Sequence, residues 1–157
     1  MEELAGELHT LMRRVPAAVT VVTAEVDGFR YGITVNSFHS LSLEPPLVGM
    51  SINRQTQLNL LLKEAEVFAV SVLAGDQDWV AQHFSRSVPP LVLWDGIPLR
   101  DVPGPPQIDG AIGWLLCRRL AEHEVGTHTF FVGAVESVEE GRQAPVLVYA
   151  HRAYHGL

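Results

Sequence analysis

The sequence predicts an antiparallel β-barrel or β-sandwich with a few peripheral helices. Three observations support this fold class: short runs rich in β-branched residues, turn signals between those runs, and helical patterns at only a few points. Strands and helices do not alternate regularly, which disfavours a doubly wound parallel sheet. The chain has 157 residues, of which 47% are hydrophobic. We therefore expect one domain with its own core, spanning residues 1–157.

Three short helices are predicted. They cover residues 2–14, 56–64 and 76–84. In the first, apolar residues recur at helical spacing until Pro16 ends the helix. Thr56 is the expected N-cap of the second helix, and Asp76 or Asp78 that of the third.

The predicted strands are joined mainly by tight turns. They cover residues 17–25, 29–37, 47–53, 67–73, 111–124, 129–139 and 146–149. Asp27-Gly28 is a strong signal for a hairpin between the first two strands, and Val125-Gly126 is the expected turn of a second, longer hairpin. Residues 86–107 are dense in proline and have no period, so they are predicted to form a loop across the surface.

Composition and charge exclude several functions. The formal charge is −7 and no long basic run occurs, which disfavours nucleic-acid binding. No apolar run reaches the roughly 20 residues of a membrane helix. Cys117 is the only cysteine, so no internal disulfide can form, and we expect a reducing cytoplasm. The histidines lack the spaced Cys or carboxylate partners of a metal site, and none is predicted.

Uncharged hydrogen-bonding residues gather around the end of the second strand. Thr34 and Asn36 share one face of this strand, and Ser37 and His39 follow at its end. Such groups suit the edge of a neutral ligand that carries donors and acceptors. They also suit the solvated face of an ordinary antiparallel strand.

Two further segments could bind an anion. Asn53, Arg54 and Thr56 join a strand to a helix start, where unpaired N–H groups and the helix dipole favour a phosphate. The other interpretation is that Thr56 only caps the helix while Arg54 is solvated. The chain has no G-x-G-x-x-G, P-loop or G-x-S-x-G motif, so any nucleotide is bound in another manner.

The second segment is Phe84-Ser85-Arg86, which adjoins the proline-rich loop and combines an aromatic ring, a hydroxyl and a guanidinium. The other interpretation, which the residues alone favour, is a helix C-terminus with an arginine that the dipole stabilises. His128 lies at the tip of the longer hairpin among hydroxyl neighbours, either as a functional group or as an exposed loop histidine.

Taken together, these segments resemble the flavin reductase family with the FMN-binding split barrel, the reductase components of two-component monooxygenases. The resemblance runs from about Leu8 to His155. It rests on PAAVTVVTAEVDG, YGITVNSFHSLSLEPPLV, INRQTQ, FAVSVL, HFSR, DGAIGWLLCR, GTHTFFVGAVESV and VYAHRAYH. The pairing of TVNSF with a following SL-x-PPL and a distant HTFFVG is quite specific.

The resemblance implies a mainly β, six-stranded antiparallel Greek-key split barrel with peripheral helices, which forms a homodimer. It also implies a cofactor site. Thr34, Asn36 and Ser37 would line the isoalloxazine and ribityl chain; Ser51, Asn53, Arg54 and Thr56 would serve the ribityl and phosphate end; Phe84, Ser85 and Arg86 would face the phosphate or adenylate. His128 is predicted as the residue at the reacting centre, near the nicotinamide, and Tyr154 and His155 would border the pocket.

The implied activity is hydride transfer from NADH to FAD or FMN, with NADPH as a further possible donor, and with reduced flavin passing by diffusion to a flavin-dependent monooxygenase. The flavin supplies the chemistry, so no strong acid, base or nucleophile is needed. The proline-rich loop could wall an adenine, which slightly favours FAD. Two other functions stay open: a non-catalytic flavin-binding or storage protein, and a β-barrel module for another hydrophobic ligand.

Overall fold

The computed structural model describes residues 1–157 and contains three helices and ten strands. In chain order these are α1 (Glu2–Met12), β1 (Ala17–Ala18), β2 (Thr20–Val26), β3 (Phe29–Val35), β4 (His39–Leu43), β5 (Pro46–Asn53), α2 (Gln57–Glu64), β6 (Val67–Val72), α3 (Asp78–Phe84), β7 (Gly113–Val125), β8 (His128–Glu140), β9 (Leu147–Ala150) and β10 (Ala153–Gly156).

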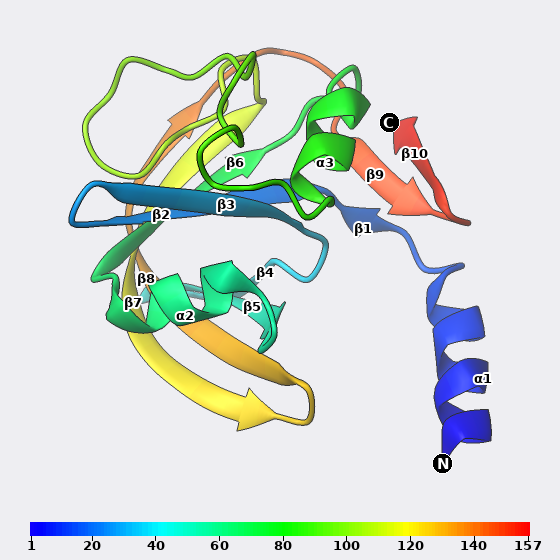
Figure 1. Ribbon diagram of the computed structural model, residues 1–157. Coiled ribbons are helices and arrows are strands. Elements are labelled where there is room, and N and C mark those ends of the chain that lie inside the picture. The colour runs from blue at the N-terminus through cyan, green and yellow to red at the C-terminus, as the bar shows by residue number, and fades with distance from the viewer.

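Every strand pairing is antiparallel. One sheet has seven strands in the order β3-β2-β6-β7-β8-β5-β4, and a second has three in the order β1-β9-β10. The 13-residue strands β7 and β8 form one long hairpin; the first part of β7 pairs with β6 and the first part of β8 with β5. Figure 1 shows this long, curved hairpin, which the β2–β3 hairpin crosses in this view. The predicted mainly β, antiparallel fold class is confirmed.

The core lies where β2, β5, β6 and α2 meet. β2 is buried over its first five residues, so both of its faces are covered. α2 turns Leu58, Leu61 and Leu62 inward, and these belong to one cluster of 25 buried apolar residues. The buried polar atoms are satisfied as well: the Thr20 hydroxyl donates to Val35 O at 2.8 Å, and no buried side-chain N or O atom lacks a partner.

The predicted β2–β3 hairpin is confirmed with the turn that its sequence requires. Asp27 has φ 51° and Gly28 has φ 81°, the positive values that a two-residue type I′ turn needs at both central positions. The longer hairpin turns at Gly126 and Thr127. Thr56 caps α2 as predicted: its hydroxyl accepts a hydrogen bond from Asn59 N–H at 3.2 Å.

Some local predictions were wrong. α3 begins at Asp78 after Gln77, and neither Asp76 nor Asp78 caps it. The carboxylate of Asp76 binds the Arg142 guanidinium instead, so a partner distant in sequence displaces the local cap. The short strands β4 and β10 were not predicted. The apolar residues of β4, Leu41 and Leu43, are exposed at the edge of the sheet and give no burial pattern.

The segment between α3 and β7 forms no helix or named strand, as its prolines predict. Leu93 is only 1% exposed and packs into the core, whereas Leu91 is fully exposed. The Trp94 ring lies 5.4 Å from that of Phe84, and its N–H donates to Arg30 O at 3.3 Å. This loop therefore covers the outer side of β3 and the end of α3.

Helix α1 stands apart from both sheets, as Figure 1 shows. None of its residues is buried, and its apolar residues Leu4, Leu8, Leu11 and Met12 are at least half exposed. No helix has both the length and the apolar character that crossing a membrane requires.

Cys117 is expected to resist thiol reagents while the protein is folded. It is fully buried in β7, and burial, together with the charge of Glu136, raises the pKa of its thiol to about 12. Since the thiolate is the reactive form, labelling with a chromogenic disulfide reagent should occur only after unfolding in denaturant. Stoichiometric labelling of the native protein would contradict this prediction.

Candidate functional site

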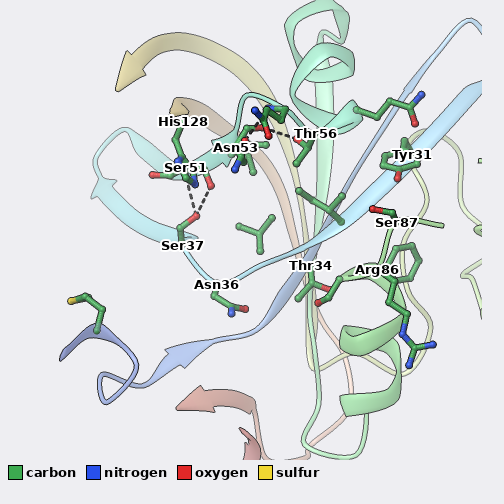
Figure 2. A pocket seen from close by; sticks show the side chains of 18 of the residues that line it. Tyr31, Thr34, Asn36, Ser37, Ser51, Asn53, Thr56, Arg86, Ser87 and His128 are labelled. Carbon is green, nitrogen blue, oxygen red and sulfur yellow. Dashed lines mark hydrogen bonds between the residues drawn. The ribbon is translucent and has the colours of Figure 1, made fainter. Parts of the chain in front are cut away.

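A cleft of about 870 Å³ opens where β3, β5, the start of α2, the end of α3 and the β7–β8 turn approach one another (Figure 2). Its 19 lining residues are His9, Met12, Tyr31, Ile33, Thr34, Val35, Asn36, Ser37, Ser51, Ile52, Asn53, Gln55, Thr56, Gln57, Phe84, Ser85, Arg86, Ser87 and His128. Figure 2 shows Ser37, Ser51 and His128 grouped on one side of the cleft and Tyr31, Ser87 and Arg86 on the other.

The cleft brings together ten of the thirteen site residues that the sequence predicted. These are Thr34, Asn36, Ser37, Ser51, Asn53, Thr56, Phe84, Ser85, Arg86 and His128. They come from segments up to 94 positions apart (34 to 128), and β-sheet pairing explains part of this: Asn53 of β5 lies directly opposite His128 of β8. The functional role of each residue stays a prediction.

Arg54 and Tyr154 do not line the cleft. The Arg54 guanidinium lies 3.3 Å from the Glu124 carboxylate. Tyr154 packs against Tyr149, with ring centroids 5.1 Å apart, in the separate three-stranded sheet. His155, in the same strand, contacts Ala150 O through its ring nitrogen. β10 turns back on β9 after two residues with positive φ, and this fold-back keeps both side chains in that sheet.

Sequence reasoning missed several lining residues. Gln55 and Gln57 flank the predicted Thr56, and their position beside a helix start could have identified them. Ser87 continues the predicted Phe84–Arg86 segment. His9 and Met12 come from α1, and no pattern in the sequence indicates that this helix reaches the cleft.

The Ser37 hydroxyl joins two strands. It donates to Ser51 O and accepts from Ser51 N–H, both at 2.9 Å, as the dashed lines in Figure 2 show. One side chain thus replaces a pair of backbone ladder bonds beyond the end of β3. Because its only proton is used in the bond to Ser51 O, the Ser37 hydroxyl fixes the shape of the cleft wall and does not donate to a ligand in this arrangement.

Thr34 is held in a similar way. Its hydroxyl donates to Ala81 O at 2.6 Å, and the Ser85 hydroxyl donates to the same carbonyl at 2.7 Å. Ala81 lies in the middle of α3, so the bond from Thr34 fastens this helix to β3, whereas the bond from Ser85 closes the C-terminal turn of the helix itself. The segment Phe84–Arg86 follows directly and forms one end of the cleft.

Asn53, Gln55 and Thr56 form a corner of the cleft at the start of α2, which we call the phosphate-type corner. Hydrogen bonds within the chain hold this corner as well. Thr56 donates to Asn53 O at 2.8 Å, while Asn53 Oδ1 accepts from Gln55 N–H at 2.9 Å. These bonds leave the Asn53 amide group and the side chains of Gln55 and Gln57 directed to solvent. Helix dipole and unpaired N–H groups at the start of α2 make this corner favourable for negative charge.

His128 presents one free ring nitrogen. Its Nδ1 lies 2.9 Å from the Thr127 hydroxyl, and Nε2 has no partner within the chain. The ring is half-buried at the rim of the cleft, opposite Asn53. Thr127 can therefore fix the orientation of the imidazole while Nε2 contacts a ligand.

Free donors in the cleft include three amides and a guanidinium. The side chains of Asn36, Gln55, Gln57 and Arg86 make no hydrogen bond or ion pair within the chain, and no carboxylate lines the cleft. No group of three His, Cys, Asp or Glu residues could hold a metal ion. The arrangement can bind a planar ligand with a polar edge and an anionic tail, but it supplies no nucleophile and no strong acid or base of its own.

The comparisons with known proteins point to one family. Residues 12–157 match the family described as flavin reductase like domain. A relative from Thermus thermophilus, the reductase component of 4-hydroxyphenylacetate 3-monooxygenase, is 37% identical over 93% of this chain and 92% of its own. An NADH-dependent flavin reductase from a Rhodococcus species is 34% identical over 95% of this chain and 90% of its own.

A solved structure agrees with this. The NADH:FAD oxidoreductase SgcE6 of Streptomyces globisporus, in complex with NAD and FAD fragments, superimposes with a TM-score of 0.90. It is 30% identical, and the match covers 98% of this chain and 92% of that one. The cleft, the antiparallel sheets and the sequence matches agree, and the chain belongs to the flavin reductase like domain family.

Proposed function

We propose that this chain transfers hydride from NADH to FAD or FMN and supplies the reduced flavin to a partner flavin-dependent monooxygenase. The observation that supports this most strongly is the cleft, which gathers free amides, one guanidinium and a helix start, and has no carboxylate in its lining. Such a site fits a flavin, which needs a polar edge for its ring and a positive end for its phosphate. The names of the relatives agree with this activity.

The flavin, when bound, supplies the redox chemistry by accepting hydride from the nicotinamide. The protein's own residues bind the flavin and orient it toward the nicotinamide. The Asn36 amide, at the end of β3 and free of intrachain bonds, would donate to the pyrimidine edge and stabilise negative charge there. Ser51 and Asn53 would contact the ribityl chain, and the backbone N–H groups at the start of α2, beside the capping residue Thr56, would hold the phosphate.

His128 would position the nicotinamide. Its free Nε2 lies on the rim of the cleft and its Nδ1 is held by Thr127, so the ring can contact the second substrate without moving. Holding two rings at contact distance accounts for much of the rate in such a reaction. His128 therefore acts by orientation and is not an obligate acid.

FAD is slightly favoured over FMN as the flavin. Phe84, Ser85, Arg86 and Ser87 extend the cleft away from the α2 corner, and Arg86 provides an unpaired cation there. Phe84 packs on Trp94 of the proline-rich loop, so an apolar wall adjoins this cation. An adenylate group would fit between them.

A homodimer is part of this proposal. The apolar residues of α1 are exposed although the helix reaches the cleft through His9 and Met12. A second copy covering α1 would bury this apolar surface and close the adjoining wall of the cleft. Size-exclusion chromatography with light scattering tests the assembly.

NADH oxidation followed by absorbance tests the function. The purified chain is mixed with NADH and with FAD, FMN or no flavin, and the series is repeated with NADPH. Flavin-dependent NADH consumption supports the reductase. A yellow protein without NADH consumption would indicate flavin storage, and neither result would indicate a binding module for another ligand.

Thr34 provides a test of how the cleft is held. Replacing Thr34 with valine removes the bond to Ala81 O, which still accepts from Ser85, so the stability loss should be about 1 kcal/mol. The loosened end of α3 should raise the Kd for FAD more than the Kd for riboflavin. Thr34→Ser keeps the hydroxyl and should restore FAD binding. Equal changes for both ligands, or no rescue by serine, would contradict this role.

A further inference from the structure

Glu124, near the turn of the β7–β8 hairpin, has three partners. Its carboxylate lies 3.3 Å from the Arg54 guanidinium and 3.2 Å from the Lys63 ammonium, and it accepts a hydrogen bond from the Thr129 hydroxyl at 2.8 Å. The bond from Thr129, followed by the contacts with Lys63 and Arg54, lowers the pKa of this carboxyl. Glu124 is therefore negatively charged at neutral pH.

Arg54 stands at the phosphate-type corner but faces away from it. Its neighbours Asn53 and Gln55 both line the cleft, whereas Arg54 does not. Its backbone N–H donates to Thr127 O at 3.0 Å, which fixes the position of the residue between α2 and the hairpin turn. The backbone of Arg54 is therefore fixed, and only its side chain can rotate between the cleft and Glu124.

The pair between Arg54 and Glu124 is weak enough to exchange. Half of each side chain is exposed, so water and salt screen the attraction. A phosphate that arrives at the start of α2 offers Arg54 a bidentate partner with stronger, charge-assisted bonds. Lys63 and Thr129 remain with Glu124 when the guanidinium leaves, so the carboxylate is not left unpaired.

We propose that Glu124 competes with the phosphate of the flavin for Arg54 and thereby keeps flavin binding weak and reversible. This inference rests on the proposed function, because it assumes that flavin occupies the cleft. It gives the hairpin end a role in setting how readily reduced flavin is released. A protein that passes its flavin to another enzyme needs such release.

The test compares flavins with and without a phosphate. Glu124→Gln keeps the size of the side chain and an oxygen for Thr129, but removes the charge. Its Kd for FMN and FAD should fall by roughly three- to fivefold, the range expected for an exposed ion pair. The Kd for riboflavin should not change. Flavin fluorescence quenching at low and moderate salt measures all three.

Two further variants make the result specific. Glu122→Gln removes an equal charge two positions away on the same strand, from a residue that pairs with Arg119 at 3.9 Å, and should leave the FMN affinity unchanged. In an Arg54→Gln background, Glu124→Gln should no longer tighten FMN binding. Tightening that persists there, or that is equal for riboflavin and FMN, would overturn the proposal. Failure of the unaltered chain to bind any flavin would instead overturn the proposed function together with it.

Discussion

Asn36→Ala is expected to raise the Kd for both FAD and FMN by roughly tenfold, the loss of one or two hydrogen bonds that are made without competition inside a site. Asn36 is exposed at the end of β3 and has no intrachain bond, so its removal should not change the free energy of unfolding. Fluorescence quenching of the flavin measures the affinity, and urea denaturation measures the stability.

Ser40→Ala serves as the control for Asn36→Ala, because Ser40 is an exposed polar residue on β4, the next strand along the chain, and does not line the cleft. It should bind flavin normally. An unchanged flavin Kd in Asn36→Ala would show that Asn36 does not bind the flavin ring. The proposal would then lose the side-chain donor that it assigns to the pyrimidine edge.

His128→Ala should lower kcat/KM for NADH by about tenfold or more while the flavin Kd changes by less than about threefold. The imidazole lies at the rim and has one free nitrogen, so it is placed to contact the second substrate rather than the buried part of the first. Steady-state rates at saturating flavin, combined with a flavin titration, separate the two effects.

His123→Ala is the matched control for His128, since His123 is an exposed histidine on the same hairpin and lies outside the cleft lining. It should keep full activity. A parallel loss of NADH turnover and flavin affinity in His128→Ala would show that the ring shapes the flavin site, contrary to the role proposed here.

Local signals in the sequence predicted much of the fold. Asp27-Gly28 requires a tight turn because both residues adopt positive φ, and the β-branched run of β2 is buried on both faces. Where a distant partner decides the local structure, sequence reasoning failed. Asp76 binds Arg142 rather than capping α3, and an edge strand such as β4 leaves its apolar residues in solvent.

The candidate site, like the fold, could be predicted from the sequence only in part. Motif positions predicted which residues meet, and ten of them line one cleft. Motif positions did not indicate what each hydroxyl does. Thr34 and Ser37 bind backbone carbonyls within the chain, and Arg54 turns toward Glu124, because these side chains have partners on other strands or on α3. Such partners are fixed by the three-dimensional packing.

A crystal structure of the chain with FAD or FMN bound tests the central claim most directly. We expect the polar edge of the ring beside Asn36, the phosphate at Thr56 and the start of α2, and one ring face open toward His128. A flavin bound elsewhere, or this cleft filled by the protein's own side chains in crystals grown with saturating flavin, would contradict the account.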